Sequence, residues 1–333
     1  MDLLFWIGSF VISLIILIKS ADIFTESAEK IGLAFKIPSF IVGVAIVSIG
    51  TSLPELATSI VGVMKNDTEI AAANAIGSNI ANILLIVGIA SIVAKKISIK
   101  RSLINLDLPL LASVTTLIVF ILQDKQVTRI EGAIAVCTYL IYTFYLVSSG
   151  KERKALAHKD NGGEKELPAT RIDRLKILKR LWKHHEKIEP KVFAYLIASS
   201  IFIYLGANQT VESIIKIAEG INVDSSLIVM SAMALGTSLP ELIVSVQAAA
   251  KKKYEIALGN VFGSNIFNAL MVIGLPAIIT PLTVDEKTYS VGIPFLIATT
   301  ILYVFSGISR KIYNWEGMMY IMIYILFLVK IFE

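Results

Sequence analysis

The sequence predicts an all-α polytopic membrane protein, with ten transmembrane helices arranged as two five-helix repeats of inverted topology. Three observations predict this fold: long apolar runs, one duplicated stretch, and an uneven distribution of basic residues. Of the 333 residues, 55% are hydrophobic and 17% are charged, and the mean hydropathy is +0.74. Many apolar runs are long enough to cross a hydrocarbon core about 30 Å thick. The lipid bilayer is therefore the first expected partner.

Apolar runs bounded by charges or turn residues define the ten spans in order. The first five cover residues 3–18, 37–64, 70–93, 103–122 and 127–147, and the second five cover residues 192–217, 221–249, 256–279, 291–308 and 315–332. This division gives an N-terminal half over residues 1–149, a polar linker over 150–191 and a C-terminal half over 192–333. We expect the first span to be retained, because no basic leader or small-residue cleavage pattern accompanies it.

One stretch of forty residues occurs twice. Residues 49–88 recur as residues 235–274 at a constant offset of 186, with 20 of 40 positions identical and no gap. The matches include carboxylates, amides and hydroxyls inside apolar surroundings, which shared composition does not explain. Five spans separate the two copies, so they enter the membrane in opposite directions. The stretch is therefore predicted to be a duplicated site that meets its copy near the bilayer midplane.

The basic residues orient the spans. With the amino terminus outside, 25 of the 31 Lys and Arg residues fall in cytoplasmic loops, 13 of them in the linker. This bias predicts a multi-pass protein of the cell (plasma) membrane with both termini outside and the linker in the cytoplasm. Basic residues confined to such loops do not indicate nucleic-acid binding. The single cysteine, Cys137, and three histidines in the linker argue against thiol chemistry and zinc.

Each copy contains a helix-breaking pair, Gly50 with Pro54 and Gly236 with Pro240. A proline four residues after a glycine removes the N–H group that would bond the glycine carbonyl and pushes that carbonyl aside. We therefore expect spans two and seven to be broken there. A freed carbonyl is tolerated in a membrane where it lines a cavity or binds a cation, although a plain proline kink is the alternative.

A glutamate follows each pair, near the middle of its span. A charged side chain at that depth costs about 2.5 to 3.5 kcal/mol and is functional by default. Neither Glu55 nor Glu241 has a basic residue nearby in sequence, so the compensating charge should come from a bound cation or from protons. Hydroxyls accompany both glutamates at helical spacings. They belong to Thr51, Ser52 and Ser59 in the first copy and to Thr237, Ser238 and Ser245 in the second.

The neighbouring spans each carry a stripe of small polar residues at intervals of four. The stripes consist of Asn74, Ser78 and Asn82, and of Asn260, Ser264 and Asn268. We favour ion contact for the serines and for Asn82 and Asn268. For Asn74, Asn260, Asn79 and Asn265, interhelical hydrogen bonding is an equal alternative.

A cage of carboxylates, carbonyls, hydroxyls and amides suits a hard cation, and a roomy oxygen site favours Ca²⁺ over Mg²⁺. The same oxygens could instead hold several Na⁺ ions. Mutually exclusive occupancy would make exchange the natural mechanism.

These motifs resemble the sodium/calcium exchanger branch of the calcium/cation antiporter superfamily, in a minimal prokaryotic form. The sequences GTSLPE and GSN-x-x-N each occur twice here, and the likeness covers nearly the whole chain. The resemblance implies alternating access and ion sites between helices two, three, seven and eight. It implies that Ca²⁺ binds Glu55, Glu241 and the carbonyls of Thr51 and Thr237. It implies that Na⁺ uses Ser52, Ser78, Thr237, Ser238, Ser264, both glutamates and the carbonyls of Ser48 and Ala234, with Asn82 and Asn268 flanking the central site.

Two differences between this sequence and related antiporters limit which counter-ion we expect. Potassium-dependent members carry Asp at the position of Asn268, which argues against K⁺ cotransport. Proton-coupled relatives typically carry a GN-x-x-E pattern instead of GTSLPE, although Ca²⁺/H⁺ antiport stays an alternative. A divalent cation channel is a further alternative. No nucleophile, metal triad or nucleotide loop indicates an enzyme. We expect no cofactor besides the transported Ca²⁺ and Na⁺, and the sequence identifies no protein partner.

Overall fold

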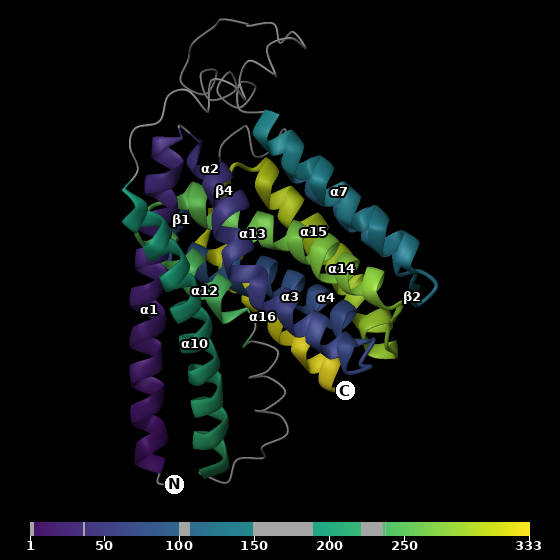
Figure 1. The fold of residues 1–333 in the computed structure, drawn as a ribbon, viewed down its shortest axis with the longest axis horizontal. Helices are drawn as coiled ribbons and strands as arrows, with labels where there is room; N and C mark the ends of the chain where they lie inside the picture. The colour runs from purple at the N-terminus through teal and green to yellow at the C-terminus, as the bar shows by residue number, and fades with distance from the viewer. Residues whose placement is uncertain (1–2, 36, 100–106, 149–188, 221–235, 237) are drawn as a thin grey trace, which may run out of the picture.

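The computed structural model describes residues 3–35, 37–99, 107–148, 189–220, 236 and 238–333, which are mostly helical (Figure 1). The first-half elements are α1 (Leu3–Ala34), α2 (Ser39–Val42), η1 (Gly43–Val47), α3 (Ser48–Met64), α4 (Ile70–Ala81), η2 (Asn82–Ile86), α5 (Val87–Ala94), β1 (Lys96–Ser98), α6 (Leu108–Ile121), β2 (Gln126–Val127) and α7 (Arg129–Ser148). The second-half elements are α10 (Pro190–Gly220), α12 (Leu239–Ala250), α13 (Tyr254–Phe267), η4 (Asn268–Val272), α14 (Ile273–Ile279), β3 (Leu282–Thr283), η5 (Thr288–Gly292), α15 (Ile293–Ile308), β4 (Lys311–Tyr313) and α16 (Asn314–Phe332). The label η marks a π-helical turn.

Seven helical segments among the described residues are long and apolar enough to cross a membrane. They are Leu3–Ala34, Ser39–Met64, Ile70–Ala94, Pro190–Ile217, Tyr254–Ile279, Thr288–Ile308 and Asn314–Phe332. The helices α6 and α12 are apolar but shorter. The chain is therefore an integral membrane protein, and its helical character agrees with the predicted fold class. The predicted first span, residues 3–18, is too short, because α1 continues through a charged stretch to Ala34.

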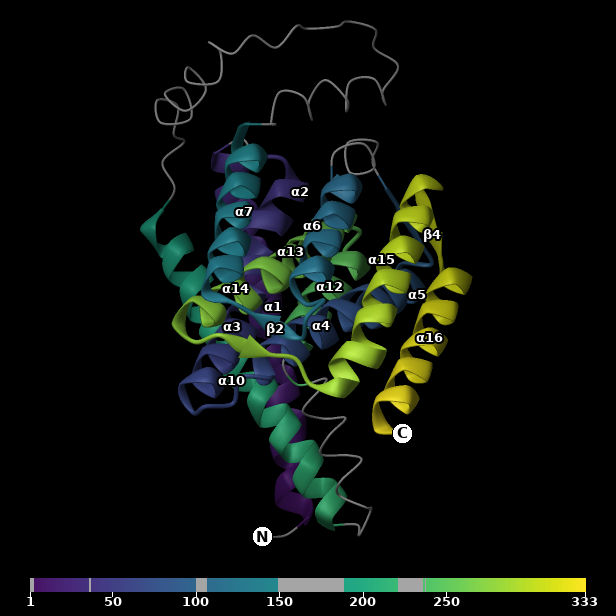
Figure 2. The same cartoon turned by 90° about the vertical axis from the view of Figure 1, so that its right-hand side faces the viewer.

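The longest helices, α1 and α10, lie side by side and project beyond the other helices at one end (Figures 1 and 2). Polar side chains join the two helices inside this pair. The Gln209 Nε2 donates to the Ser9 hydroxyl at 3.0 Å, and the Thr210 hydroxyl donates to Ser13 at 3.0 Å. Gly206 allows close packing, because a Cβ there would lie 3.1 Å from the backbone nitrogen of Leu17. Side-chain hydrogen bonds of this kind stabilise helix pairs in membranes.

The two ends of the chain lie toward one end of the molecule, and the helix ends that flank the linker lie toward the opposite end. In both views the amino end of α1 and the carboxyl end of α16 lie toward the bottom, whereas the carboxyl end of α7 and the amino end of α10 lie toward the top (Figures 1 and 2). The segment 149–188, which connects α7 to α10, lies outside the described residues, but its two attachment points share one end of the molecule.

Short antiparallel strand pairs join loops from different halves. Strand β1 pairs with β4 through Ile97 and Ile312, and β2 pairs with β3 through Val127 and Leu282. These four residues are buried, so each pair closes over the ends of the helices that it connects. The sequence did not predict these strands, because two or three residues carry too little periodicity to be recognised.

The turns that follow α3 and α12 have the same conformation. Asn66 has φ 68° and Lys252 has φ 60°, and these two positions differ by the repeat offset. In both turns a backbone N–H reaches back to a carbonyl five residues earlier, from Asp67 to Gly62 at 3.0 Å and from Lys253 to Ala248 at 2.8 Å. A left-handed residue after the last helical turn is a common way to end a helix. The duplicated sequence therefore adopts a duplicated local structure.

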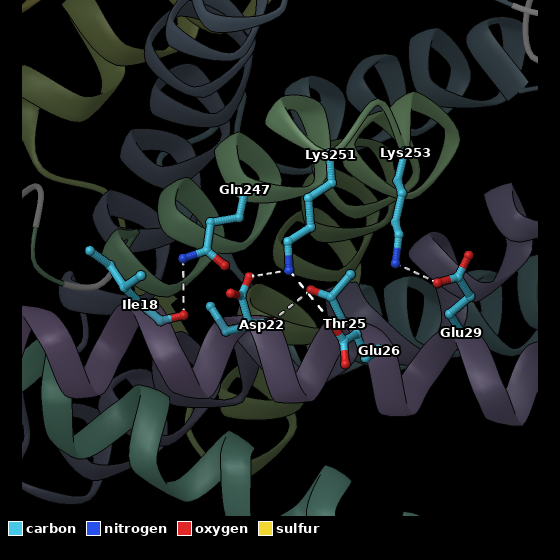
Figure 3. A network of polar contacts seen from close by, with 9 residues as sticks. Ile18, Asp22, Thr25, Glu26, Glu29, Gln247, Lys251 and Lys253 are labelled. Atoms are coloured by element: carbon cyan, nitrogen blue, oxygen red, sulfur yellow. Dashed lines mark hydrogen bonds and ion pairs between the residues drawn. The ribbon is translucent and has the colours of Figure 1, made fainter.

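The second of these turns is held to α1 by an ionic network (Figure 3). The Lys251 ammonium lies 2.7 Å from Asp22 and 3.7 Å from Glu26, and Lys253 lies 2.5 Å from Glu29. The hydrogen bond to Asp22, followed by the charges of Asp22 and Glu26, raises the pKa of Lys251 above its usual range. These pairs give partners to the acidic residues of α1 that lie beyond Lys19, the charged residue at which the predicted span ended.

Candidate ion-binding site

The two glutamates of the duplicated stretch lie in the core. Glu55 projects from α3 and is 0% exposed, and Glu241 projects from α12 and is 1% exposed. Glu241 Oε1 lies 2.9 Å from the hydroxyl of Ser52, which is about one helical turn before Glu55 on α3. In the described part of the chain, neither carboxylate forms an ion pair with a basic side chain. The halves therefore bring two like charges together, and their mutual repulsion favours a cation between them.

Ser52 connects the halves at side-chain level. Its hydroxyl oxygen lies 2.9 Å from Oε1 of Glu241 and 2.9 Å from the hydroxyl oxygen of Ser264. Ser52 belongs to α3, whereas Glu241 and Ser264 belong to α12 and α13. Ser52 of the first copy is thus within hydrogen-bonding distance of two predicted site residues of the second copy.

The predicted ion-contacting residues that the structure describes are also buried, whereas Gly50, Pro54 and Gly236 of the helix-breaking pairs are half-buried. Exposed fractions do not exceed 3% for Ser48, Thr51, Ser52, Glu55, Ser78, Asn82, Ser238, Glu241, Ser264 and Asn268. Ala234 and Thr237 fall outside the described residues, so the structure places the complete hydroxyl set only for the first copy. Gly236 and Pro240 are described, and Pro240 is buried.

Several buried polar atoms at the site have no hydrogen-bond partner among the described residues. They are both carboxylate oxygens of Glu55, Oε2 of Glu241, the hydroxyl of Ser238, and the amide nitrogen and oxygen of Asn82 and Asn268. A buried polar group without a partner costs about 1 to 3 kcal/mol. Most of these atoms are oxygens, which suits a hard cation. The observation agrees with the predicted donor set of carboxylates, amides and hydroxyls.

Asn82 and Asn268 open equivalent π-helical turns, η2 and η4. A π turn inserts an extra residue into the helix and is frequent at functional sites. Both side chains are 0% exposed. The structure therefore gives the two predicted flanking amides the same unusual backbone setting in both halves.

The four remaining asparagines form hydrogen bonds within the protein. The Asn74 Nδ2 donates to the Ser59 hydroxyl and to the Glu55 carbonyl, both at 3.1 Å. The Asn79 Nδ2 donates to the Asn265 carbonyl at 3.0 Å, and the Asn265 Nδ2 donates to the Val261 carbonyl at 2.6 Å. The Asn260 Nδ2 donates to the Ser245 hydroxyl at 2.9 Å. The bonds of Asn74, Asn79 and Asn260 join different helices, whereas that of Asn265 lies within α13. The Oδ1 atoms of Asn79 and Asn265 have no hydrogen-bond partner among the described residues.

The helix break expected at Pro54 is not an interruption of the helix. Helix α3 continues from Ser48 to Met64 with Pro54 inside it, and the irregular turn, η1, lies before Ser48. A proline removes only its own N–H group, so neighbouring turns can keep helical geometry. The Ser200 hydroxyl of α10 donates a long, 3.5 Å hydrogen bond to the carbonyl of Gly50. Sequence reasoning missed Ser200, because nothing in its local pattern marks it.

The glycines of the two pairs provide room for the peripheral helices. A Cβ at Gly50 would meet the ring of Phe24 on α1 at 2.5 Å, and one at Gly236 would meet Val211 on α10 at 2.9 Å. The same position in each copy thus faces one long peripheral helix, and a larger side chain would push that helix away.

Comparison with known proteins identifies the family. The family profile described as "Sodium/calcium exchanger protein" matches residues 5–148 and 191–332. The chain belongs to the sodium/calcium exchanger family. A member from Methanosarcina acetivorans, "Sodium/calcium exchanger MaX1", is 33% identical over 347 aligned positions that cover 96% of this chain and 97% of the relative. "Inner membrane protein YrbG" of Escherichia coli is 29% identical over 88% of this chain and 86% of its own length.

Solved structures of the exchanger NCX_Mj share the fold. One, titled as soaked with 2.5 mM Na⁺ and 1 mM Sr²⁺, has a TM-score of 0.75 and 26% identity and covers 96% of both chains. Another, titled as soaked with zero Na⁺ and Ca²⁺, has a TM-score of 0.77 and 25% identity over 98% of both chains. A member of this family is a transporter and not an enzyme, as the sequence indicated.

Proposed function

We propose that this exchanger family member carries Na⁺ and Ca²⁺ in opposite directions across the cell membrane by alternating access. The observation that carries the proposal is the pair of buried carboxylates, Glu55 and Glu241, contributed by the two halves without a basic partner in the described residues. Two formal negative charges match one Ca²⁺ ion. The family membership and the name of the relative MaX1 support the same pair of ions.

The ligand assignment follows the chemistry of the buried oxygens. We assign Ca²⁺ to Glu55 and Glu241 together with the main-chain carbonyls of Thr51 and Thr237. The proposed Na⁺ ligands are Glu55, Glu241, Ser52, Ser78, Thr237, Ser238, Ser264 and the carbonyls of Ser48 and Ala234. Asn82 and Asn268 flank the central position. Ca²⁺ accepts six to eight oxygen ligands in flexible geometry, which this set can supply.

Exchange follows from sharing the two glutamates. If both ions need Glu55 and Glu241, then bound Ca²⁺ excludes Na⁺ and bound Na⁺ displaces Ca²⁺. An empty site would leave two carboxylates facing each other in a medium of low dielectric constant, which is costly. The protein would therefore change between its outward-open and inward-open states only with an ion bound. Each transported ion would then cross the membrane only in exchange for the other.

We infer that the chain has ten membrane-spanning helices in two inverted five-helix halves, residues 1–149 and 192–333, around a cytoplasmic linker, 150–191. The copies of the duplicated stretch, 49–88 and 235–274, would meet at the midplane. The equivalent turns at Asn66 and Lys252 support the repeat. The shared end of the two termini, opposite the attachment points of the linker, supports an even number of spans (Figures 1 and 2). The basic linker would place both termini outside.

The amide at Asn268 bears on the counter-ion. A third carboxylate there would add a charge for a further cation, and the amide does not, so we propose exchange without K⁺ and without a cofactor. With three Na⁺ per Ca²⁺, as the family resemblance implies, one net charge moves per cycle. That charge is worth about 2.3 kcal/mol per 100 mV.

The test is ⁴⁵Ca²⁺ uptake into liposomes that contain the purified protein. Vesicles loaded with Na⁺, with K⁺ or at acidic pH are diluted into Ca²⁺ medium, with the membrane potential clamped at two values. We expect uptake only from Na⁺-loaded vesicles. Because Na⁺ efflux carries more positive charge outward than Ca²⁺ entry carries inward, an interior-negative potential should slow uptake and an interior-positive potential should speed it. Uptake that follows the pH gradient would indicate Ca²⁺/H⁺ antiport instead, and single-channel currents in a planar bilayer would indicate a channel.

A further inference from the structure

The side chain of Asn260 contacts both halves beside the candidate site. Its Nδ2 donates to the Ser245 hydroxyl at 2.9 Å and lies 3.5 Å from the main-chain carbonyl of Glu241. Its Oδ1 lies 3.1 Å from the Thr51 hydroxyl and can accept its proton, for which the Ser48 carbonyl, at 3.2 Å, is the competing acceptor. Asn260 is 0% exposed. One amide on α13 therefore links α12, which carries Glu241, to α3, which carries Glu55.

The equivalent asparagine in the first copy forms half of the same pattern. The Asn74 Nδ2 donates to the Ser59 hydroxyl and to the Glu55 carbonyl. Asn74, Ser59 and Glu55 are the positions that the repeat offset relates to Asn260, Ser245 and Glu241. Each asparagine thus holds the turn that follows its own glutamate. The link across the halves, from Thr51 to Asn260, is additional.

The polar atoms of Asn260 are already engaged in the protein. An amide nitrogen donates two hydrogen bonds, and both of its protons have an acceptor here. The amide oxygen can accept from Thr51. This differs from Asn82 and Asn268, whose amide atoms have no partner among the described residues. Asn260 is therefore placed to position the site and not to contact an ion.

We propose that Asn260 is a positioning residue that fixes the spacing of Glu55 and Glu241 through Thr51, and that this spacing favours Ca²⁺ over Na⁺. The proposal depends on the function proposed above. A single Ca²⁺ must approach both carboxylates at once, at oxygen distances of about 2.3–2.6 Å. Several Na⁺ ions can share the same oxygens without any single ion having to approach both carboxylates. Loosening the link between the halves should therefore weaken Ca²⁺ binding more than Na⁺ binding.

The test compares binding of the two ions to the purified full-length protein in detergent. Ca²⁺ and Na⁺ are titrated separately, and each apparent Kd is obtained from the rise in unfolding temperature. In Thr51→Val the hydroxyl is lost while the shape and the main-chain carbonyl remain. We expect its Ca²⁺ Kd to rise about tenfold and its Na⁺ Kd to change less than about threefold, the scale of one lost buried hydrogen bond. Asn260→Ala should shift the ratio of the two Kd values in the same direction, and Thr51→Ser should restore it.

Asn79→Ala is the matched control. This change also removes a buried hydrogen bond between the halves, from Asn79 to the Asn265 carbonyl. That bond joins α4 to α13 and involves neither of the helices that carry the glutamates. We expect it to lower the unfolding temperature without changing the ratio of the Kd values. The proposal is overturned if Thr51→Val keeps the ratio of the unaltered protein, if Thr51→Ser does not restore it, or if Asn79→Ala shifts it equally. Failure of the proposed function would differ, because the unaltered protein would then show no Na⁺-driven Ca²⁺ uptake.

Discussion

Ser52 and Glu241 lie 189 positions apart in the chain, yet the hydroxyl oxygen of Ser52 is 2.9 Å from a carboxylate oxygen of Glu241. This contact joins a residue of the first copy to the acidic residue of the second. It makes the carboxylate of one half depend on a side chain of the other. Any ion bound by Glu241 would thus be sensitive to the position of α3.

The first prediction concerns that contact. Ser52→Ala removes a hydrogen bond to a carboxylate, which is worth about 1.5 to 3 kcal/mol. Because Ser52 is also a proposed Na⁺ ligand, we expect the apparent Na⁺ affinity to fall by about tenfold or more. The measurement is the Na⁺ concentration that half-saturates Ca²⁺ uptake. Ser113→Ala is the control, since among the described residues the exposed Ser113 hydroxyl bonds only to the Pro109 carbonyl of its own helix. Equal effects of the two changes would contradict the assignment.

A second prediction concerns the charge of the site. Asn268→Asp would add a third carboxylate to the proposed site, at a position where the amide atoms now have no partner in the described residues. We expect cation affinity to rise by about tenfold and turnover to fall, because the added charge stabilises the loaded state and slows ion release. Equilibrium Ca²⁺ binding and the maximal uptake rate measure the two effects. Unchanged affinity would show that residue 268 lies too far from the ion to act on it.

A third prediction concerns the crossing of η1 over α13. A Cβ at Gly43 would lie 2.7 Å from the Ile256 carbonyl and 3.0 Å from the Cα of Gly259. Backbone atoms cannot turn away as a side chain can, so Gly43→Ala should cost about 1–3 kcal/mol of stability. The measurement is the unfolding temperature in detergent without ions. Gly8→Ala, where no atom of the described residues lies within 4 Å, should be neutral or slightly stabilising, and similar losses in both variants would contradict the packing argument.

A fourth prediction concerns the ionic network of Figure 3. The pKa of Lys251 is raised in the folded protein, first by its hydrogen bond to Asp22. A raised pKa means that the ammonium stabilises the fold fully below its unfolded pKa of about 10.4 and less as the pH rises through the folded value. Because both side chains are about one-third exposed, the contribution should stay below about 1 kcal/mol. Lys251→Met should lower the unfolding temperature slightly at pH 8, and the difference from the unaltered protein should shrink as the pH rises above the unfolded pKa and through the raised folded pKa. A difference that stays constant over this pH range would show that packing of Lys251, and not its charge, stabilises the turn.

The sequence predicted most of the candidate site because the duplication marks it twice. Glu55 and Glu241 sit at equivalent positions in apolar spans, and burial in the structure agrees with that reading. Asn82 and Asn268 were recognised for the same reason. A polar residue that recurs at the equivalent position of the second copy can be recognised from one sequence, because the two copies can be compared with each other.

Contacts between different elements could not be read in this way. The hydrogen bond from Ser200 to the Gly50 carbonyl, and the one from Thr51 to Asn260, depend on how helices far apart in sequence pack. The length of α1 was underestimated because Lys19 ended the apolar run, and the partners of the acidic residues beyond it, Lys251 and Lys253, come from the other half. Local pattern predicts which residues are polar inside the membrane, whereas tertiary packing determines which of them bond to each other.

The measurement that tests the central claim most directly is Na⁺-driven ⁴⁵Ca²⁺ uptake by liposomes containing Glu55→Gln or Glu241→Gln. Each change keeps the size of the side chain and removes one of the two charges that would balance Ca²⁺. Variants should first be shown to unfold at a temperature similar to that of the unaltered protein. We predict that either change abolishes uptake while Glu131→Gln, at a partly exposed position in the first turn of α7 outside the site, leaves it intact. Uptake that persists in either site variant would contradict the claim that the two carboxylates together hold the transported ion.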